Sequence, residues 1–144
     1  MTSATHKKKV LVVDDEEGIR RLVRAILNEN YVVIEAKNGE EAVSLAHEQR
    51  PDVIIMDLMM PMMDGITACS AIKKDPVTTA IPVVMLTAIS HGLNRKLAEN
   101  VAAVDAYMTK PFTSQGLLGT VAQLLASVGR TPRDSGCVTA ARVE

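Results

Sequence analysis

Five polar residues that suit phosphate or metal chemistry stand at the ends of short apolar runs. They are Asp14, Asp15, Asp57, Thr87 and Lys110. One acid in such a place is often only the cap of the next helix. Together, however, three carboxylates, one hydroxyl and one ammonium group offer complementary roles. If the runs are parallel strands, all five side chains meet at one edge of a sheet.

Three carboxylates a few ångströms apart repel each other by roughly a few kcal/mol per pair near a protein surface. A hard divalent cation offsets this repulsion, and Mg²⁺ prefers one or two carboxylates together with water and substrate phosphate. Lys110 supplies a further positive charge, and Thr87 a hydroxyl donor. An aspartate in this setting is a nucleophile toward phosphorus that forms an acyl phosphate. Phosphoryl transfer needs mainly positioning and charge neutralisation, and this set of residues offers both.

Other phosphate-binding solutions are missing from the sequence. Neither G-x-G-x-x-G nor G-x-x-x-x-G-K-[ST] follows any apolar run. The segment after the first run is Asp-Asp-Glu-Glu, residues 14–17, which repels a bare phosphate. These features argue against a nucleotide or flavin site.

Two periodicities alternate along the chain. They predict the strands and helices that must position these residues. Short apolar runs typical of buried strands occupy residues 10–13, 31–34, 53–56, 83–86 and 106–108. Apolar residues at helical spacing fill the intervals, at 19–27, 40–48, 66–72, 93–101 and 117–125. In the first of these stripes, Arg20, Arg21 and Arg24 fall on the opposite, polar side. The pattern predicts a doubly wound α/β domain with a parallel sheet of five strands and five helices.

Length and composition limit the classes of protein. A chain of 144 residues with 47% apolar and 23% charged residues is expected to be one soluble globular domain. A net charge of −1 and only three aromatic residues argue against a nucleic-acid surface. No run is long enough for a membrane helix, and the first is too short for a signal peptide. We therefore expect no membrane contact. The two cysteines form no C-x-x-C motif, and this composition suits a reducing cytoplasm, where we expect the protein to be located.

The chain is expected to divide into three parts. Residues 1–7 form a flexible N-terminus and residues 8–128 the folded domain. Gly129 stops the last helix, and residues 129–144 lack periodicity, which predicts a flexible tail or a linker to a further domain.

The sequence resembles the receiver domains of two-component response regulators, in particular the single-domain, chemotaxis-regulator type. The resemblance covers residues 8–127 and rests on several motifs in order. They are Asp14-Asp15, D-L-M-M-P-M-M-D-G from Asp57, Thr87-Ala88, and Y-M-T-K-P-F from Tyr107. It implies a flavodoxin-like fold with strand order 2-1-3-4-5.

By this resemblance Asp57 is the phosphorylation site. Asp15, Asp57 and the backbone carbonyl of Met59 hold Mg²⁺, for which Mn²⁺ substitutes, while Asp14 acts through a bound water. Lys110 pairs with the phosphoryl group. The resemblance also implies a cis peptide bond between Lys110 and Pro111.

Thr87 and Tyr107 are the expected switch residues. By the resemblance, Thr87 moves toward the phosphoryl group and Tyr107 swings inward behind it, which alters the face formed by the fourth helix, the fifth strand and the fifth helix. The bland alternative for Tyr107 is a half-buried strand residue with a wet hydroxyl.

The resemblance also implies the partners. The donor is a phosphohistidine on a sensor histidine kinase or a histidine phosphotransfer protein. The output protein or domain, and whether phosphorylation drives homodimerisation, stay open. So does the choice between a stand-alone regulator and a receiver module of a longer one. We expect a signalling phosphoacceptor that is no enzyme beyond its own phosphoryl transfer and slow self-dephosphorylation.

Two rival functions are weaker. A phosphatase of the haloacid-dehalogenase kind carries a second acid two residues after its nucleophile, where this chain has Met59. A binding module with an inactive pocket would not need all five polar residues of the predicted site. The chain departs from the family at Ala103, where glycine is common. Apolar Met59 and Ile89 lead to the hypothesis that water attacks the acyl phosphate slowly.

Overall fold

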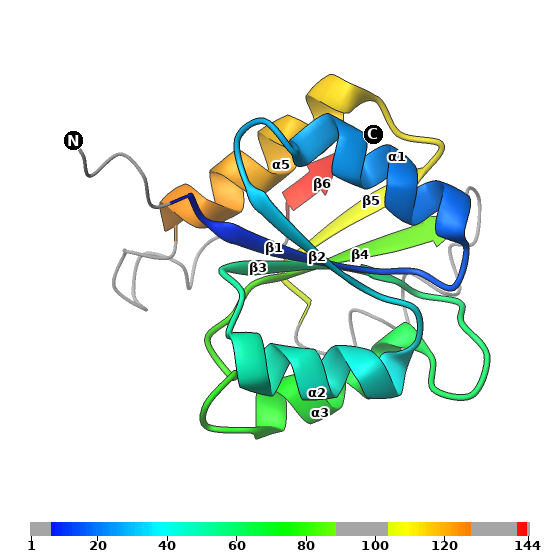
Figure 1. Cartoon of the computed structure of the whole chain (residues 1–144), viewed down its shortest axis with the longest axis vertical. Helices are drawn as coiled ribbons and strands as arrows, with labels where there is room; N and C mark the ends of the chain where they lie inside the picture. Colours follow the sequence, from blue (N-terminus) through cyan, green and yellow to red (C-terminus); the bar gives the residue numbers. More distant parts are fainter. Residues whose placement is uncertain (1–6, 89–103, 128–140, 144) are drawn as a thin grey trace.

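The computed structural model describes residues 7–88, 104–127 and 141–143. Its centre is a parallel sheet of six strands in the order β2-β1-β3-β4-β5-β6 (Figure 1). The strands are β1 Lys9–Val13, β2 Val32–Ala36, β3 Val53–Asp57, β4 Val83–Ala88, β5 Ala106–Lys110 and β6 Ala141–Val143. The four described helices are α1 Glu17–Leu27, α2 Gly39–Gln49, α3 Gly65–Lys74 and α5 Ser114–Ser127.

Helices cover both faces of this sheet. Helices α1 and α5 lie on one face, and α2 and α3 lie on the other (Figure 1). Because successive strand residues point to opposite faces, β1 and β3 feed two separate cores. Leu11 and Ile54 belong to the cluster with the α2 and α3 residues, whereas Val10 and Val53 belong to the one with α1 and α5. Burial on both faces explains why these strands read as continuous apolar runs.

The predicted fold class is confirmed, with the first five strands in the order 2-1-3-4-5. Strands β4 and β5 each run two residues further than predicted, so Thr87 and Lys110 lie within them rather than after them. The reason is backbone pairing, which continues through Thr87 with Thr109 and Ala88 with Lys110 whatever the side chains are. The fourth expected helix, at residues 93–101, lies outside the described residues.

Strand β6 was not predicted from the sequence. It pairs in parallel with β5, from Ala106 opposite Ala141 to Met108 opposite Val143. Three residues are too few to show a period, and this strand exists by pairing with an edge that β5 offers. The division into N-terminus, domain and tail stays a prediction.

None of the helices in the described ranges has the length and apolar character needed to cross a lipid bilayer.

Candidate functional site

Three carboxylates gather at the carboxyl ends of β1 and β3. Oxygen atoms of Asp14, Asp15 and Asp57 all lie within 4.8 Å of one another. The sheet brings them together because β1 and β3 are neighbours, with Val13 opposite Met56. Asp14 is fully buried and Asp57 is 5% exposed. Asp15 is exposed, so the cluster reaches solvent on its side.

Lys110 enters the same site from the end of β5. Its Nζ atom lies 3.2 Å from Oδ2 of Asp14 and 3.2 Å from Oδ1 of Asp57. One ammonium group therefore bridges the two buried carboxylates. The peptide bond between Lys110 and Pro111 is cis, which confirms the expectation.

Asp14 has both side-chain oxygens engaged. Oδ1 accepts a hydrogen bond from the backbone N–H of Glu16 at 2.9 Å, and Oδ2 contacts Lys110. Asp15 and Asp57 keep more freedom to bind a ligand. The indirect, water-mediated role expected for Asp14 stays a prediction.

The charges of the cluster are incompletely balanced. Burial, together with the negative charge of Asp14, raises the pKa of Asp57 to about 6, although the contact with Lys110 opposes the shift. Burial acts to lower the pKa of Lys110, but the two carboxylates outweigh it and the pKa is raised. One lysine is thus too little cation for three carboxylates. The donor set, all hard oxygen atoms, fits a divalent cation such as Mg²⁺.

Thr87 and Tyr107 lie on strands beside the cluster. Asp57 is paired with Leu86, so Thr87 stands one residue further along the neighbouring strand and is 2% exposed. Tyr107 is 1% exposed and belongs to the core cluster with α2 and α3. Its ring is therefore buried rather than half-buried, and the bland alternative from the sequence does not describe it.

The loop after β3 is shaped by close approaches. Asp64 caps α3 by accepting a hydrogen bond from the N–H of Thr67 at 2.8 Å. A Cβ atom on Gly65 would collide with the carbonyl oxygen of Asp57. Glycine at the start of α3 thus lets the helix approach the acid. Met59 in this loop is 61% exposed. Its expected carbonyl contact to a metal stays a prediction, and Ile89 lies outside the described residues.

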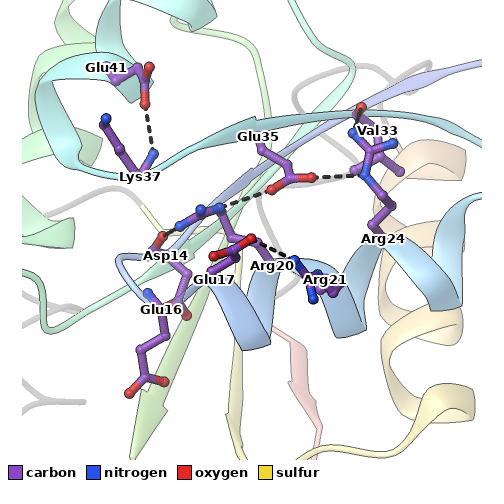
Figure 2. Close-up of polar contacts among 10 residues, drawn as sticks. All are labelled: Asp14, Glu16, Glu17, Arg20, Arg21, Arg24, Val33, Glu35, Lys37 and Glu41. Carbon is purple, nitrogen blue, oxygen red and sulfur yellow. Dashed lines mark hydrogen bonds and ion pairs between the residues drawn. The ribbon is translucent and has the colours of Figure 1, made fainter.

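The sequence did not reveal a role for Arg20. Helical spacing placed this residue on the polar side of α1, but its side chain is only 15% exposed. Its Nη1 donates a hydrogen bond to the carbonyl oxygen of Asp14 at 2.6 Å, and its Nε donates one to Glu35 at 2.9 Å (Figure 2). The only signal was Glu35 itself, an acid inside an otherwise apolar strand.

A doubly wound sheet with three acids and a lysine at its carboxyl edge defines a class of phosphate-handling α/β domains that work with a metal ion rather than a glycine-rich loop. The family model of the response regulator receiver domain matches residues 10–122. The chain belongs to the response regulator receiver domain family.

Curated relatives support this family assignment. The transcriptional regulatory protein ResD of Bacillus subtilis is 42% identical over 128 residues, which cover 88% of this chain and 52% of ResD. The alkaline phosphatase synthesis regulator PhoP of the same organism is 40% identical over 82% of this chain and 48% of its own length. This chain therefore spans about half of the curated relatives it matches.

Two solved structures show the same fold. The chemotaxis protein CheY4 of Vibrio cholerae superimposes with a TM-score of 0.77 at 32% identity, covering 83% of this chain and 99% of CheY4. The receiver domain of the sensor histidine kinase PA1611 from Pseudomonas aeruginosa gives a TM-score of 0.79 at 28% identity, covering 85% and 100%. That structure has a magnesium ion coordinated in its active-site cleft.

Proposed function

We propose that this chain is a signalling switch in which Asp57 accepts a phosphoryl group from a phosphohistidine donor with the help of Mg²⁺. The observation that carries the proposal is the geometry of Asp57. It is buried at the end of β3, in a carboxylate cluster within 4.8 Å, and its Oδ1 lies 3.2 Å from Lys110. Family membership supports the same role.

In the proposed transfer, a carboxylate oxygen of Asp57 forms a bond to phosphorus. The bond between phosphorus and the donor's imidazole nitrogen breaks, and its electron pair stays on the nitrogen. Lys110 pairs with the phosphoryl oxygens as charge moves onto Asp57. The chain catalyses this transfer and slow self-dephosphorylation, and no other reaction.

Asp15, Asp57 and the backbone carbonyl of Met59 would hold the cation, with Asp14 acting through water. The bound Mg²⁺, or Mn²⁺ in its place, supplies positive charge against the phosphoryl oxygens. The raised pKa of Asp57 supports this assignment, because it shows that Lys110 alone does not offset the carboxylates. The magnesium ion in the PA1611 receiver domain is a second support.

The readout of the switch would pass through Thr87 and Tyr107. Phosphorylation adds close to two negative charges and three acceptor oxygens at Asp57. The Thr87 hydroxyl would turn to one of these oxygens, and Tyr107 would shift with β5. A changed face of the fourth helix, β5 and α5 would then bind an output partner or a second copy of the chain.

The donor would be a sensor histidine kinase or a histidine phosphotransfer protein in the cytoplasm. The output is open, because ResD and PhoP are transcriptional regulators about twice as long as their matched part. This chain is proposed to act alone or as the receiver module of a longer regulator, and not to bind nucleic acid or membrane itself.

The test is the intact mass of the protein after incubation with acetyl phosphate. We expect one phosphate adduct that requires Mg²⁺ and is absent from Asp57→Asn. Asp75→Asn, at a partly exposed position directly after α3, is the matched control and should be modified like the wild type. No adduct in the wild type, even with a phosphohistidine donor present, would refute the proposal.

A further inference from the structure

Arg20 joins the acid pair to the second strand. Its guanidinium lies between α1 and β2 and makes two hydrogen bonds from different nitrogens (Figure 2). Nη1 donates to the carbonyl oxygen of Asp14 at 2.6 Å, and Nε donates to Oε1 of Glu35 at 2.9 Å. The side chain is only 15% exposed, so solvent competes weakly for these contacts.

Glu35 is itself held firmly. Its second oxygen, Oε2, accepts a hydrogen bond from Nε of Arg24 at 2.8 Å, one turn further along α1. The hydrogen bonds from Arg24 and Arg20 outweigh burial and keep the pKa of Glu35 below its usual value. Charge-assisted hydrogen bonds of this kind are stronger than neutral ones. The carboxylate therefore gives Arg20 a fixed anchor on β2.

The contact point of Arg20 is the peptide group between Asp14 and Asp15. The carbonyl oxygen that Arg20 binds belongs to this peptide, and a change in ψ of Asp14 or φ of Asp15 would move one carboxylate relative to the other. The preceding peptide is also tied to β2, because the N–H of Asp14 donates to the carbonyl oxygen of Ala36 at 3.2 Å. The backbone of Asp14 is thus fixed on both sides.

We propose that Arg20 is a positioning residue of the divalent-cation site, fixing the peptide between Asp14 and Asp15 so that both carboxylates point toward Asp57. This inference rests on the metal site of the proposed function. Arg20 touches neither the cation nor the phosphoryl group. It acts through the backbone, with Glu35 as its anchor.

The direction of the change in Mg²⁺ affinity when Arg20 is removed distinguishes a positioning role from a purely electrostatic one. The guanidinium is a cation near the site, so by Coulomb's law its removal should strengthen Mg²⁺ binding. If Arg20 positions the metal ligands, its removal should weaken Mg²⁺ binding instead. Loss of a residue that orients metal ligands weakens metal binding by about 10-fold or more.

The experiment is isothermal titration of Mg²⁺ into the unphosphorylated chain for the wild type, Arg20→Ala and Arg20→Lys. We expect about 10-fold weaker binding in both variants. Lysine keeps the charge, but its single nitrogen lacks the rigid fork that reaches Asp14 and Glu35 together. Far-UV circular dichroism and urea unfolding verify that each variant is folded, and Arg20→Lys is the milder change.

Two control variants isolate the contact to Asp14. Arg24→Ala removes the other hydrogen bond to Glu35 but leaves both contacts of Arg20, so it should lose stability and lose much less Mg²⁺ affinity than Arg20→Ala. Arg21→Ala removes an exposed pair with Glu17 on the same helix and should change neither. An equal loss of affinity in Arg24→Ala would overturn the inference, because it would show only a loosened helix.

The remaining outcomes separate the inference from the proposed function. If the wild type binds Mg²⁺ and Arg20→Ala binds it equally or more tightly, the inference is wrong and the proposed function stands. Full affinity in Arg20→Lys would overturn the two-point contact. If the wild type does not bind Mg²⁺, the proposed metal site fails and the inference fails with it.

Discussion

The ammonium group of Lys110 lies 3.2 Å from a carboxylate oxygen of Asp57, yet the pKa of Asp57 is raised to about 6. Burial and the charge of Asp14 outweigh the lysine. In the folded, metal-free protein the ionised form of Asp57 is therefore less favourable than it is in the unfolded chain. This imbalance is the physical basis for the proposed metal site and for the first two predictions.

Asp57→Asn should stabilise the metal-free protein near pH 8. A carboxyl group with a raised pKa binds its proton more tightly in the folded state, so stability falls as the pH rises from 3.8 to about 6. The shift of about two units corresponds to at most about 3 kcal/mol, a gain that should disappear below pH 4. Urea unfolding with a chelator at several pH values measures it.

Asp75→Asn is the control for this effect. The pKa of the partly exposed Asp75 is lowered, mainly by its hydrogen bond with His47, so its ionised form favours the folded state. Its replacement should bring no gain at pH 8. A stability loss in Asp57→Asn at pH 8 would contradict the account.

Mg²⁺ affinity should fall as the pH decreases through about 6. The cation needs the ionised form of Asp57 and competes with its proton. In Lys110→Met the inflection should move to higher pH, because Lys110 lowers the pKa of Asp57 by charge and by hydrogen bonding. Calorimetric titrations between pH 5 and 8 test both statements. Affinity that does not vary over this range would show that Asp57 is not a ligand.

Met62→Gly should stabilise the protein slightly. Met62 has φ of 72°, in the left-handed region, and its side chain is 83% exposed, so little burial is lost. Relief of a strain of roughly 1–2 kcal/mol exceeds the roughly 0.5–1 kcal/mol entropic cost of glycine. Met62→Ala is the matched control, because it removes the same side chain but keeps Cβ. Urea unfolding should place the glycine variant above the alanine variant, and the reverse order would exclude strain at this position.

Gly65→Ala should destabilise the fold by about 1–3 kcal/mol and weaken phosphorylation. The added Cβ would collide with the carbonyl oxygen of Asp57 and approach Sδ of Met85 to 2.9 Å. Gly119→Ala is the control, because this α5 glycine has open space and alanine should gain about 0.5–1 kcal/mol in the helix. Equal effects at the two sites in thermal unfolding would show that the start of α3 does not press on Asp57.

The sequence predicts the site well where a general rule applies. Parallel strands bring their carboxyl ends to one edge, so Asp57 and Lys110 could be placed together from order and periodicity alone. Helical periodicity also assigned the faces of α1. It could not show that one charged residue of the polar face, Arg20, bends back to the backbone of Asp14. That contact depends on how α1 is rotated against β2 and on Glu35 as an anchor.

Strand β6 could not be predicted from the sequence for a different reason. Its three residues have no pattern of their own and pair with the exposed edge of β5. Such pairing is a property of the folded sheet and not of the local sequence.

The proposed phosphoacceptor role of Asp57 is tested most directly by locating the phosphoryl group within the acid cluster. The protein is phosphorylated with acetyl phosphate and Mg²⁺ and treated with borohydride, which reduces an aspartyl phosphate to homoserine, and its peptides are sequenced by mass spectrometry. We expect homoserine at position 57 and intact aspartates at positions 14 and 15. Homoserine at either of those positions, or none at position 57, would contradict the proposal.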